Sequence, residues 1–138
     1  MTTEDPALDF RPDTGRLQVW RPAEGFGIRL DGVAYPGYTQ GPHYDSMLMK
    51  VTGSALTFQS AAHKVRRALE ETRIRGVKTN IGFTLNVLKH PEFRSGEATT
   101  SFIGDNPELF EFAKGGDRAS KLLEYLAELA VNGRVGKG

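Results

Sequence analysis

The chain has 138 residues, of which 38% are hydrophobic and 25% charged, and its formal net charge is +1. This length predicts one compact domain with a hydrophobic core. The nearly balanced charge excludes an overall positive potential that would attract nucleic acid or an anionic membrane. Cysteine is absent, which excludes disulfides and thiolate zinc sites and suits an intracellular protein. No apolar run reaches the roughly 18 residues of a membrane span.

The first part of the chain predicts turns and short strands. Residues 1–15 indicate an extended segment followed by a turn. Two alternating segments, 16–20 and 27–31, predict strands that pair with each other in an antiparallel manner. A third strand is predicted over 46–53, after a loop rich in glycine and proline over 32–42.

Helical patterns begin in the middle of the chain. Apolar residues at helical spacing predict a helix over 57–72, with Thr57 as its N-cap. A joint over 73–79 follows, in which Gly76 is expected to adopt a left-handed conformation as a helix C-cap. Capping residues at the end of the joint then predict a second helix over 80–89.

The last third mixes short elements with one longer helix. The pair His90-Pro91 ends the second helix, and a helical turn is predicted over 92–95. The β-branched segment 99–103 predicts a strand, whereas 106–110 predicts a brief helix with proline at its first position. A final helix is predicted over 117–132. Together the elements predict an α+β fold: a small antiparallel sheet with packed helices, followed by a C-terminal helix.

The joint is the first candidate site because it is rich in cations. Arg73, Arg75 and Lys78 precede the start of the second predicted helix, where backbone N–H groups and arginine side chains favour an anion such as phosphate or carboxylate. The alternative is that these cations pair with Glu70, Glu71 or other carboxylates.

Two further patterns carry weaker signals. Phe26 lies near Arg29 in a predicted hairpin, which indicates either an exposed contact for a partner or an aromatic cover for the sheet edge; by alternation Phe26 falls on the face of Ile28 and Leu30. The segment 43–46 contains His, Asp and Ser, but neighbours on a strand point to alternate faces and cannot form a triad. Metal-ligand spacing is not found, and the glycines match no phosphate-binding loop.

Several motifs together resemble a known family over essentially the whole chain. They are TTEDP (2–6), PDTGR (12–16), EGFGIRLDG (24–32), PHYDSMLMKV (42–51), RALEETRIRGVKTNI (67–81), FIGDNPELF (102–110) and DRASKLLEYLAELAVNG (117–133). The sequence resembles the C-terminal subdomain of biotin carboxylases, in the form found in the pyruvate carboxylase family. The resemblance implies a subdomain over 1–113, and a hinge and helix over 114–138 that lead toward an allosteric linker domain.

The resemblance also implies a function. Members of this family use ATP, magnesium and bicarbonate to carboxylate a tethered biotin, and then transfer the carboxyl group to pyruvate to give oxaloacetate. We expect this chain to be a piece of such an enzyme, inactive alone because it lacks the ATP-binding body, the carboxyltransferase and the biotinylated domain. Its expected partners are the rest of the carboxylase, a second biotin carboxylase copy and the effector acetyl-CoA, without nucleic acid or membrane.

Site residues carry over from the family at matching positions. Asp45 matches an aspartate near the biotin end of the active site, without completing a catalytic set. Phe26 and Arg29 match positions of the biotin carboxylase dimer interface. Three further positions match the acetyl-CoA site: Arg73, Arg75 and Arg118.

Two alternatives remain open from the sequence. The first is the same subdomain of another biotin-dependent acyl-CoA carboxylase, and the second is a free-standing interaction module without catalysis. The expected compartment is the cytoplasm, or the mitochondrial matrix for an animal protein.

Overall fold

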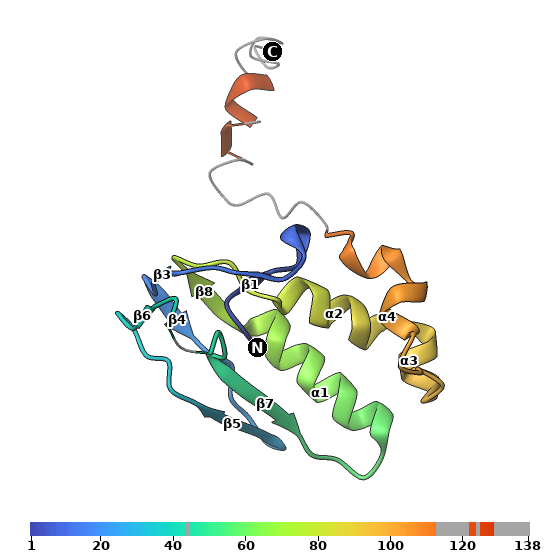
Figure 1. Cartoon of the computed structure of the whole chain (residues 1–138). Coiled ribbons are helices and arrows are strands. Elements are labelled where there is room, and N and C mark those ends of the chain that lie inside the picture. The colour runs from blue at the N-terminus through green and yellow to red at the C-terminus, as the bar shows by residue number, and fades with distance from the viewer. Residues whose placement is uncertain (44, 113–121, 124, 129–138) are drawn as a thin grey trace, which may run out of the picture.

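The computed structural model describes residues 1–43, 45–112, 122–123 and 125–128. In these ranges a layer of short antiparallel strands lies against a layer of helices (Figure 1). This arrangement confirms the predicted α+β class with a small antiparallel sheet. No helix within these ranges has the length and hydropathy needed to cross a bilayer.

The strands are short and pair in twos. They are β1 (Glu4–Asp5), β2 (Arg11–Pro12), β3 (Gly15–Arg16), β4 (Val19–Arg21), β5 (Ile28–Gly32), β6 (Thr39–Gln40), β7 (Met49–Gly53) and β8 (Arg73–Arg75). The antiparallel pairs are β1–β2, β3–β6, β4–β8 and β5–β7. The predicted pairing of 16–20 with 27–31 is therefore wrong. Alternation fixes which face of a strand is buried, but the partner is chosen by long-range packing.

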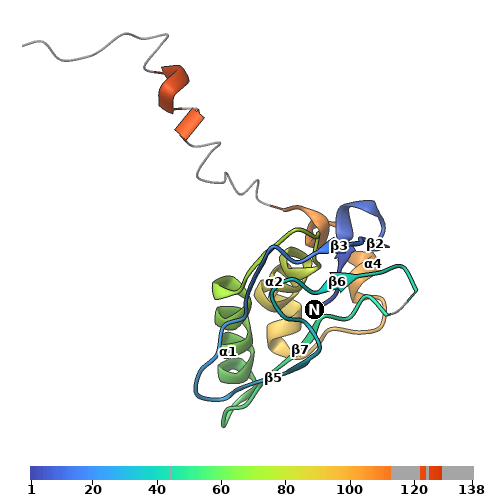
Figure 2. The same cartoon turned by 90° about the vertical axis from the view of Figure 1, so that its left-hand side faces the viewer.

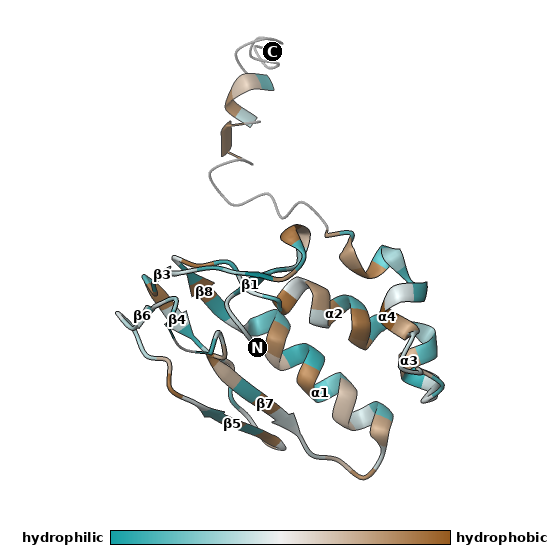
Figure 3. Ribbon diagram, in the orientation of Figure 1, coloured by the Kyte–Doolittle hydropathy of each residue, from teal (hydrophilic) through white to brown (hydrophobic). Residues whose placement is uncertain are grey.

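The helices are α1 (Phe58–Glu71), α2 (Ile81–Lys89), α3 (Pro91–Ser95) and α4 (Phe102–Asp105), with 3-10 turns η1 (Pro6–Leu8) and η2 (Pro107–Phe110). Thr57 caps α1 as predicted, because its side chain accepts a hydrogen bond from the Ser60 amide at 3.2 Å. Apolar and polar residues alternate along α1 and α2 (Figure 3), and α1 packs both on β7 and along α2.

The end of α1 differs from the prediction. The helix stops at Glu71, and Thr72 is its C-cap, with the Thr72 amide and hydroxyl both donating to the Ala68 carbonyl. Gly76 is not a helix cap, although its φ of +106° is left-handed. It follows β8, where a Cβ would collide with the carbonyl oxygen of Arg16. The predicted joint is thus partly a strand. Gly76 lacks a Cβ and therefore lets the backbone after β8 lie close to the backbone of Arg16.

The segment 99–103 is not a strand. Residues 100–101 form a turn and α4 begins at Phe102, which is 4% exposed. Phe102 packs in an aromatic cluster between helices α2, α3 and α4, whose other buried members are Phe83 and Leu109. Burial of this one ring outweighs the β propensity of the threonines before it, which are exposed.

The main core lies under the strands and is closed by the first residues of the chain. Its buried centre is Leu17, Leu48 and Met49. The N-terminus lies between β7 and α2 in both views (Figures 1 and 2), and the Leu48 amide donates to the Met1 carbonyl at 3.1 Å. The predicted strand over 46–53 begins only at Met49, because Met47 makes an isolated bridge with Thr2 and is 48% exposed.

The predicted helix over 117–132 lies mostly outside the described residues. Within it, residues 122–123 and 125–128 are helical. The short helix predicted over 106–110 is confirmed as η2, with Pro107 at its first position.

Candidate functional site

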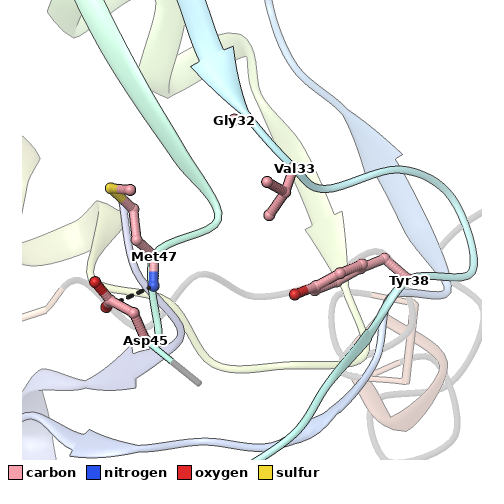
Figure 4. A pocket seen from close by; sticks show the side chains of 5 residues that line it. All are labelled: Gly32, Val33, Tyr38, Asp45 and Met47. Atoms are coloured by element: carbon pink, nitrogen blue, oxygen red, sulfur yellow. Dashed lines mark hydrogen bonds between the residues drawn. The ribbon is translucent and has the colours of Figure 1, made fainter.

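A pocket opens where β5 ends and the chain returns toward β7. It has a volume of about 450 Å³ and is lined by Gly32, Val33, Tyr38, Asp45 and Met47. Figure 4 shows Val33 and Tyr38 on one side and Asp45 and Met47 on the other. The walls are mainly apolar, and the polar groups at hand are the Tyr38 hydroxyl and the Asp45 carboxylate. Such a pocket suits a small, mostly neutral ligand with a few hydrogen-bonding groups.

The Asp45 side chain is exposed but has a fixed local contact. Its Oδ1 accepts a hydrogen bond from the Met47 amide at 3.1 Å, drawn as a dashed line in Figure 4. Aspartate commonly bonds the backbone two residues on in this way. In the described part of the chain, no donor is bonded to the second carboxylate oxygen of Asp45, which lines the pocket. Asp45 alone can bind and orient an N–H group, but it does not complete a catalytic set.

The residues after Asp45 are held by the N-terminal segment. The Thr3 amide and hydroxyl both donate to the Ser46 carbonyl, at 2.8 and 3.2 Å. The Ser46 hydroxyl donates to Glu4 Oε1 at 2.6 Å, so the serine is a structural link and no nucleophile of a triad. Burial lowers the pKa of the Met1 amine, and the nearby Glu4 carboxylate partly opposes this shift.

The tip of the loop between β4 and β5 presents an exposed aromatic ring. Phe26 is 94% exposed, and Lys64 Nζ lies 4.9 Å from the centre of its ring. The ring therefore neither shares the half-buried face of Ile28 and Leu30 nor covers the sheet edge. Arg29 also points outward and pairs with Asp31 at 2.9 Å. The fully exposed Leu56 belongs to the neighbouring loop, which bonds to the tip through the Ser54 amide and the Gly27 carbonyl.

The pairing of β4 with β8 builds a cationic surface that the sequence did not reveal. In this ladder Arg21 lies opposite Arg73, and Val19 lies opposite Arg75. Residues two apart on a strand share a face, so three arginines gather on one side of the ladder. The pair between them, Trp20 and Ile74, packs against the core instead. Arg21 was missed because its strand was expected to pair elsewhere.

The arginines of this surface are not neutralised by the glutamates proposed for them. Glu70 lies near Arg66 and Lys89, at 3.8 and 3.5 Å, and Glu71 lies 4.0 Å from Arg67. Among the described residues, Arg21, Arg73 and Arg75 have no carboxylate within 4.0 Å.

Arg73 has a second role at the end of α1. Its Nη1 donates to the carbonyls of Glu70 and Thr72, at 2.6 and 3.0 Å. These contacts satisfy carbonyls in the last turn, where a cation is favoured. The arginine is thereby fixed in place, and its remaining N–H groups can still bind an anion.

The start of α2 offers less to an anion than the sequence indicated. The Asn80 amide donates to the Thr2 carbonyl, and Asn80 Oδ1 accepts from the Thr2 amide at 3.0 Å. The Lys78 amide is bonded to Asp13 Oδ2 at 2.6 Å. Arg118, the third predicted effector residue, lies outside the described residues. In the described part of the chain, no group of three His, Asp or Glu side chains could hold a metal ion.

Comparison with known families assigns the part of the chain that contains these strands and loops. The family model of the biotin carboxylase C-terminal domain matches residues 1–105. The chain belongs to this family. The match includes β1 to β8 and α1 to α4, and ends at the last residue of α4. It also includes Asp45, Phe26, Arg29, Arg73 and Arg75.

Curated relatives of this biotin carboxylase C-terminal domain are pyruvate carboxylases. The chain is 53% identical over 100% of its length to the pyruvate carboxylase of Pichia angusta, and 52% identical over 96% to the mitochondrial pyruvate carboxylase of Homo sapiens. It spans 12% and 11% of these two proteins. The comparison therefore concerns a small part of much longer enzymes.

Solved structures share the fold. Rhizobium etli pyruvate carboxylase T882A with the allosteric activator acetyl coenzyme A matches with a TM-score of 0.83 and 50% identity, over 97% of this chain and 13% of that one. The Hydrogenobacter thermophilus 2-oxoglutarate carboxylase biotin carboxylase domain dimer, with MgADP, ADP and bicarbonate, matches with a TM-score of 0.79 and 35% identity, over 82% of this chain and 25% of that one.

Proposed function

We propose that this chain is the C-terminal subdomain of the biotin carboxylase part of a pyruvate carboxylase, an ATP-, bicarbonate- and biotin-dependent ligase that makes oxaloacetate. The observation that carries the proposal is identity of 53% along the whole chain to an enzyme of which the chain spans 12%. The subdomain contributes one wall of the active site and contacts for assembly and regulation. By itself it does not catalyse the reaction.

The pocket beside Asp45 is the part of this wall that would meet biotin. Its volume of about 450 Å³ and its apolar walls of Val33 and Met47 fit a bicyclic ring, and Asp45 and Tyr38 supply hydrogen-bonding groups for a ureido head. Biotin bound there would supply the nitrogen that accepts the carboxyl group. In this proposal Asp45 orients that head by accepting a hydrogen bond from it, and the apolar walls exclude water.

ATP and magnesium do not fit the described residues alone. These residues contain no carboxylate group of three for a metal and no phosphate-binding glycine loop. In this proposal the nucleotide site belongs to the rest of the enzyme; the chain spans 12% of the Pichia angusta relative.

Two other surfaces have roles in this proposal. Phe26 and Arg29 contact a second biotin carboxylase copy, since a ring 94% exposed at the tip of a loop is a typical anchor for a partner. Arg73, Arg75 and Arg118 bind the phosphates of acetyl-CoA, and support comes from the cationic surface of β4 and β8. Arg21 joins this group because it lies opposite Arg73.

The wider organisation follows from the same assignment. Residues 1–113 form the subdomain, and 114–138 form a hinge and helix that lead toward the allosteric linker domain. The human and rodent relatives are named as mitochondrial. For this chain we propose the cytoplasm, or the mitochondrial matrix if its source is an animal.

A complementation assay tests the proposal. The chain is mixed with a Rhizobium etli biotin carboxylase from which this subdomain has been deleted, and bicarbonate-dependent ATP cleavage is measured with free biotin. We expect activity from the mixture and none from either part. Asp45→Asn should lower the biotin-stimulated rate by tenfold or more, on the order of one lost charge-assisted hydrogen bond.

Asp9→Asn is the matched control for this assay. Asp9 is exposed and has a φ of +54°, a conformation that asparagine also accepts, so the control should leave the rate unchanged. Association without activity would remove the active-site role and leave a scaffold. Failure of two folded parts to associate would instead support a free-standing interaction module and overturn the proposal.

A further inference from the structure

A glutamine side chain is buried beside the pocket. Gln40, the last residue of β6, is 2% exposed. Its Nε2 donates to two backbone carbonyls, that of Gly41 at 3.2 Å and that of Asp45 at 3.0 Å. The amide thus joins the start and the end of the loop that carries Asp45. Polar side chains are seldom buried this deeply unless their hydrogen bonds fix something in place.

The amide has one possible orientation. Gln40 Oε1 is buried and has no hydrogen-bond partner among the residues that the structure describes. The reverse orientation would place Oε1 against the two carbonyl oxygens and would be worse. In the observed orientation Nε2 therefore keeps both of its hydrogen bonds, while Oε1 accepts none from the described residues.

The backbone of Gln40 is itself held by strand pairing. The backbone of Gln40 pairs with Gly15 in the β3–β6 ladder, and the adjoining Leu17 amide donates to the Tyr38 carbonyl at 2.8 Å. Leu17 itself is 1% exposed in the main core. The side-chain amide of Gln40 is therefore attached to a strand that pairs beside the main core, and it can hold the loop in a fixed position.

The backbone is held at two places directly after the Asp45 side chain. The carbonyl of Asp45 accepts from Gln40, and the next carbonyl, that of Ser46, accepts from Thr3. The second of these peptide groups also carries the Met47 amide, to which the Asp45 carboxylate is bonded at the pocket wall. With these two peptide groups fixed, the position of the Met47 N–H group, and with it the direction of the carboxylate, is set by the backbone.

We propose that Gln40 is a positioning residue, which holds the backbone of Asp45 so that its carboxylate faces a ligand in the pocket of Gly32, Val33, Tyr38 and Met47. The part that concerns biotin rests on the proposed function. The part that concerns the carboxylate rests on the hydrogen bonds alone.

The first arm of the test uses the isolated chain. The chemical shift of the Met47 amide proton is measured by NMR as the pH is varied through the range in which carboxylates titrate. In the unmodified chain the displacement of this chemical shift with pH reports the hydrogen bond to Asp45. In Gln40→Met, which has similar volume and no donors, we expect that displacement to fall by about half or more, because the bond depends strongly on geometry. Gln18→Met, at an exposed glutamine, is the control and should change nothing.

The second arm uses the complemented enzyme. Gln40→Met should raise KM for free biotin by about fivefold or more, the order expected for loss of one or two hydrogen bonds. ATP cleavage without biotin should stay unchanged, which a general loss of structure would not allow. Gln40→Glu should act more strongly, because a carboxylate would face two carbonyl acceptors.

The outcomes separate the two proposals. If Gln40→Met does not fold, Gln40→Asn replaces it, since it keeps an amide that is one methylene too short to reach Asp45. An unchanged Met47 displacement in a folded variant overturns the positioning role. Equal loss of biotin-dependent and biotin-independent cleavage also overturns it. If the unmodified mixture is inactive, the proposed function fails, and the NMR arm still decides the role of Gln40.

Discussion

Thr72 ties the end of α1 to the loop between β4 and β5, and its removal gives a sharp prediction. The side chain is buried, its hydroxyl donates to the Ala68 carbonyl at 2.7 Å, and its oxygen accepts from the Ala23 amide at 3.2 Å. Thr72→Val keeps the shape and removes both bonds. The Ala68 carbonyl retains the Thr72 amide as a partner, whereas the Ala23 amide loses its acceptor.

The expected loss follows from that difference. An unsatisfied donor costs about 1–3 kcal/mol when buried, and the Ala23 amide is part-buried. The surplus bond to Ala68 adds little, so the free energy of unfolding should fall by about 1–2 kcal/mol. Urea unfolding of the chain, followed by Trp20 fluorescence, measures this loss as a lower midpoint at an unchanged m-value.

Two companion variants make the measurement decisive. Thr72→Ser keeps the hydroxyl and loses one methyl group, so it should cost at most about 1 kcal/mol. Thr14→Val, at an exposed position, should cost less than about 0.5 kcal/mol. A loss below about 0.5 kcal/mol for Thr72→Val, or a larger loss for the serine variant, would show that the hydroxyl does not hold the loop to the helix.

Three other predictions concern the aromatic cluster, the tip of the β4–β5 loop and the cationic surface. Phe83→Ala should lower the free energy of unfolding by about 3–4 kcal/mol in urea, because the ring is 9% exposed and packs 5.0 Å from the Phe10 ring; a loss under about 1 kcal/mol would contradict this packing. Phe26→Ser should leave urea stability within about 0.5 kcal/mol but reduce dimer in sedimentation of the complemented enzyme; an unchanged dimer would refute the interface. Arg73→Gln should cost about 0.5–1 kcal/mol and Arg75→Gln nearly none, whereas both should weaken acetyl-CoA activation; equal stability losses would argue against the capping role.

Local sequence signals determined the helical part of this protein. Thr57 caps α1 and Pro107 begins η2 as expected, because both effects act within one turn of the chain. The outward direction of Arg29 also followed from alternation along β5. The motifs around Asp45 and Arg73 further indicated the family, which the match over residues 1–105 confirms.

Contacts between distant residues were decided only by the tertiary structure. The partner of β4 is β8, and this choice brings Arg21 beside Arg73, 52 positions apart by their numbers, 73 − 21. Phe102 becomes helical because an aromatic cluster buries it, and Gly76 is required by the nearby Arg16 carbonyl. The bond from Gln40 to the Asp45 carbonyl likewise depends on a loop closed in space. Propensity and alternation describe a few neighbouring residues, whereas pairing and burial are chosen by the whole chain at once.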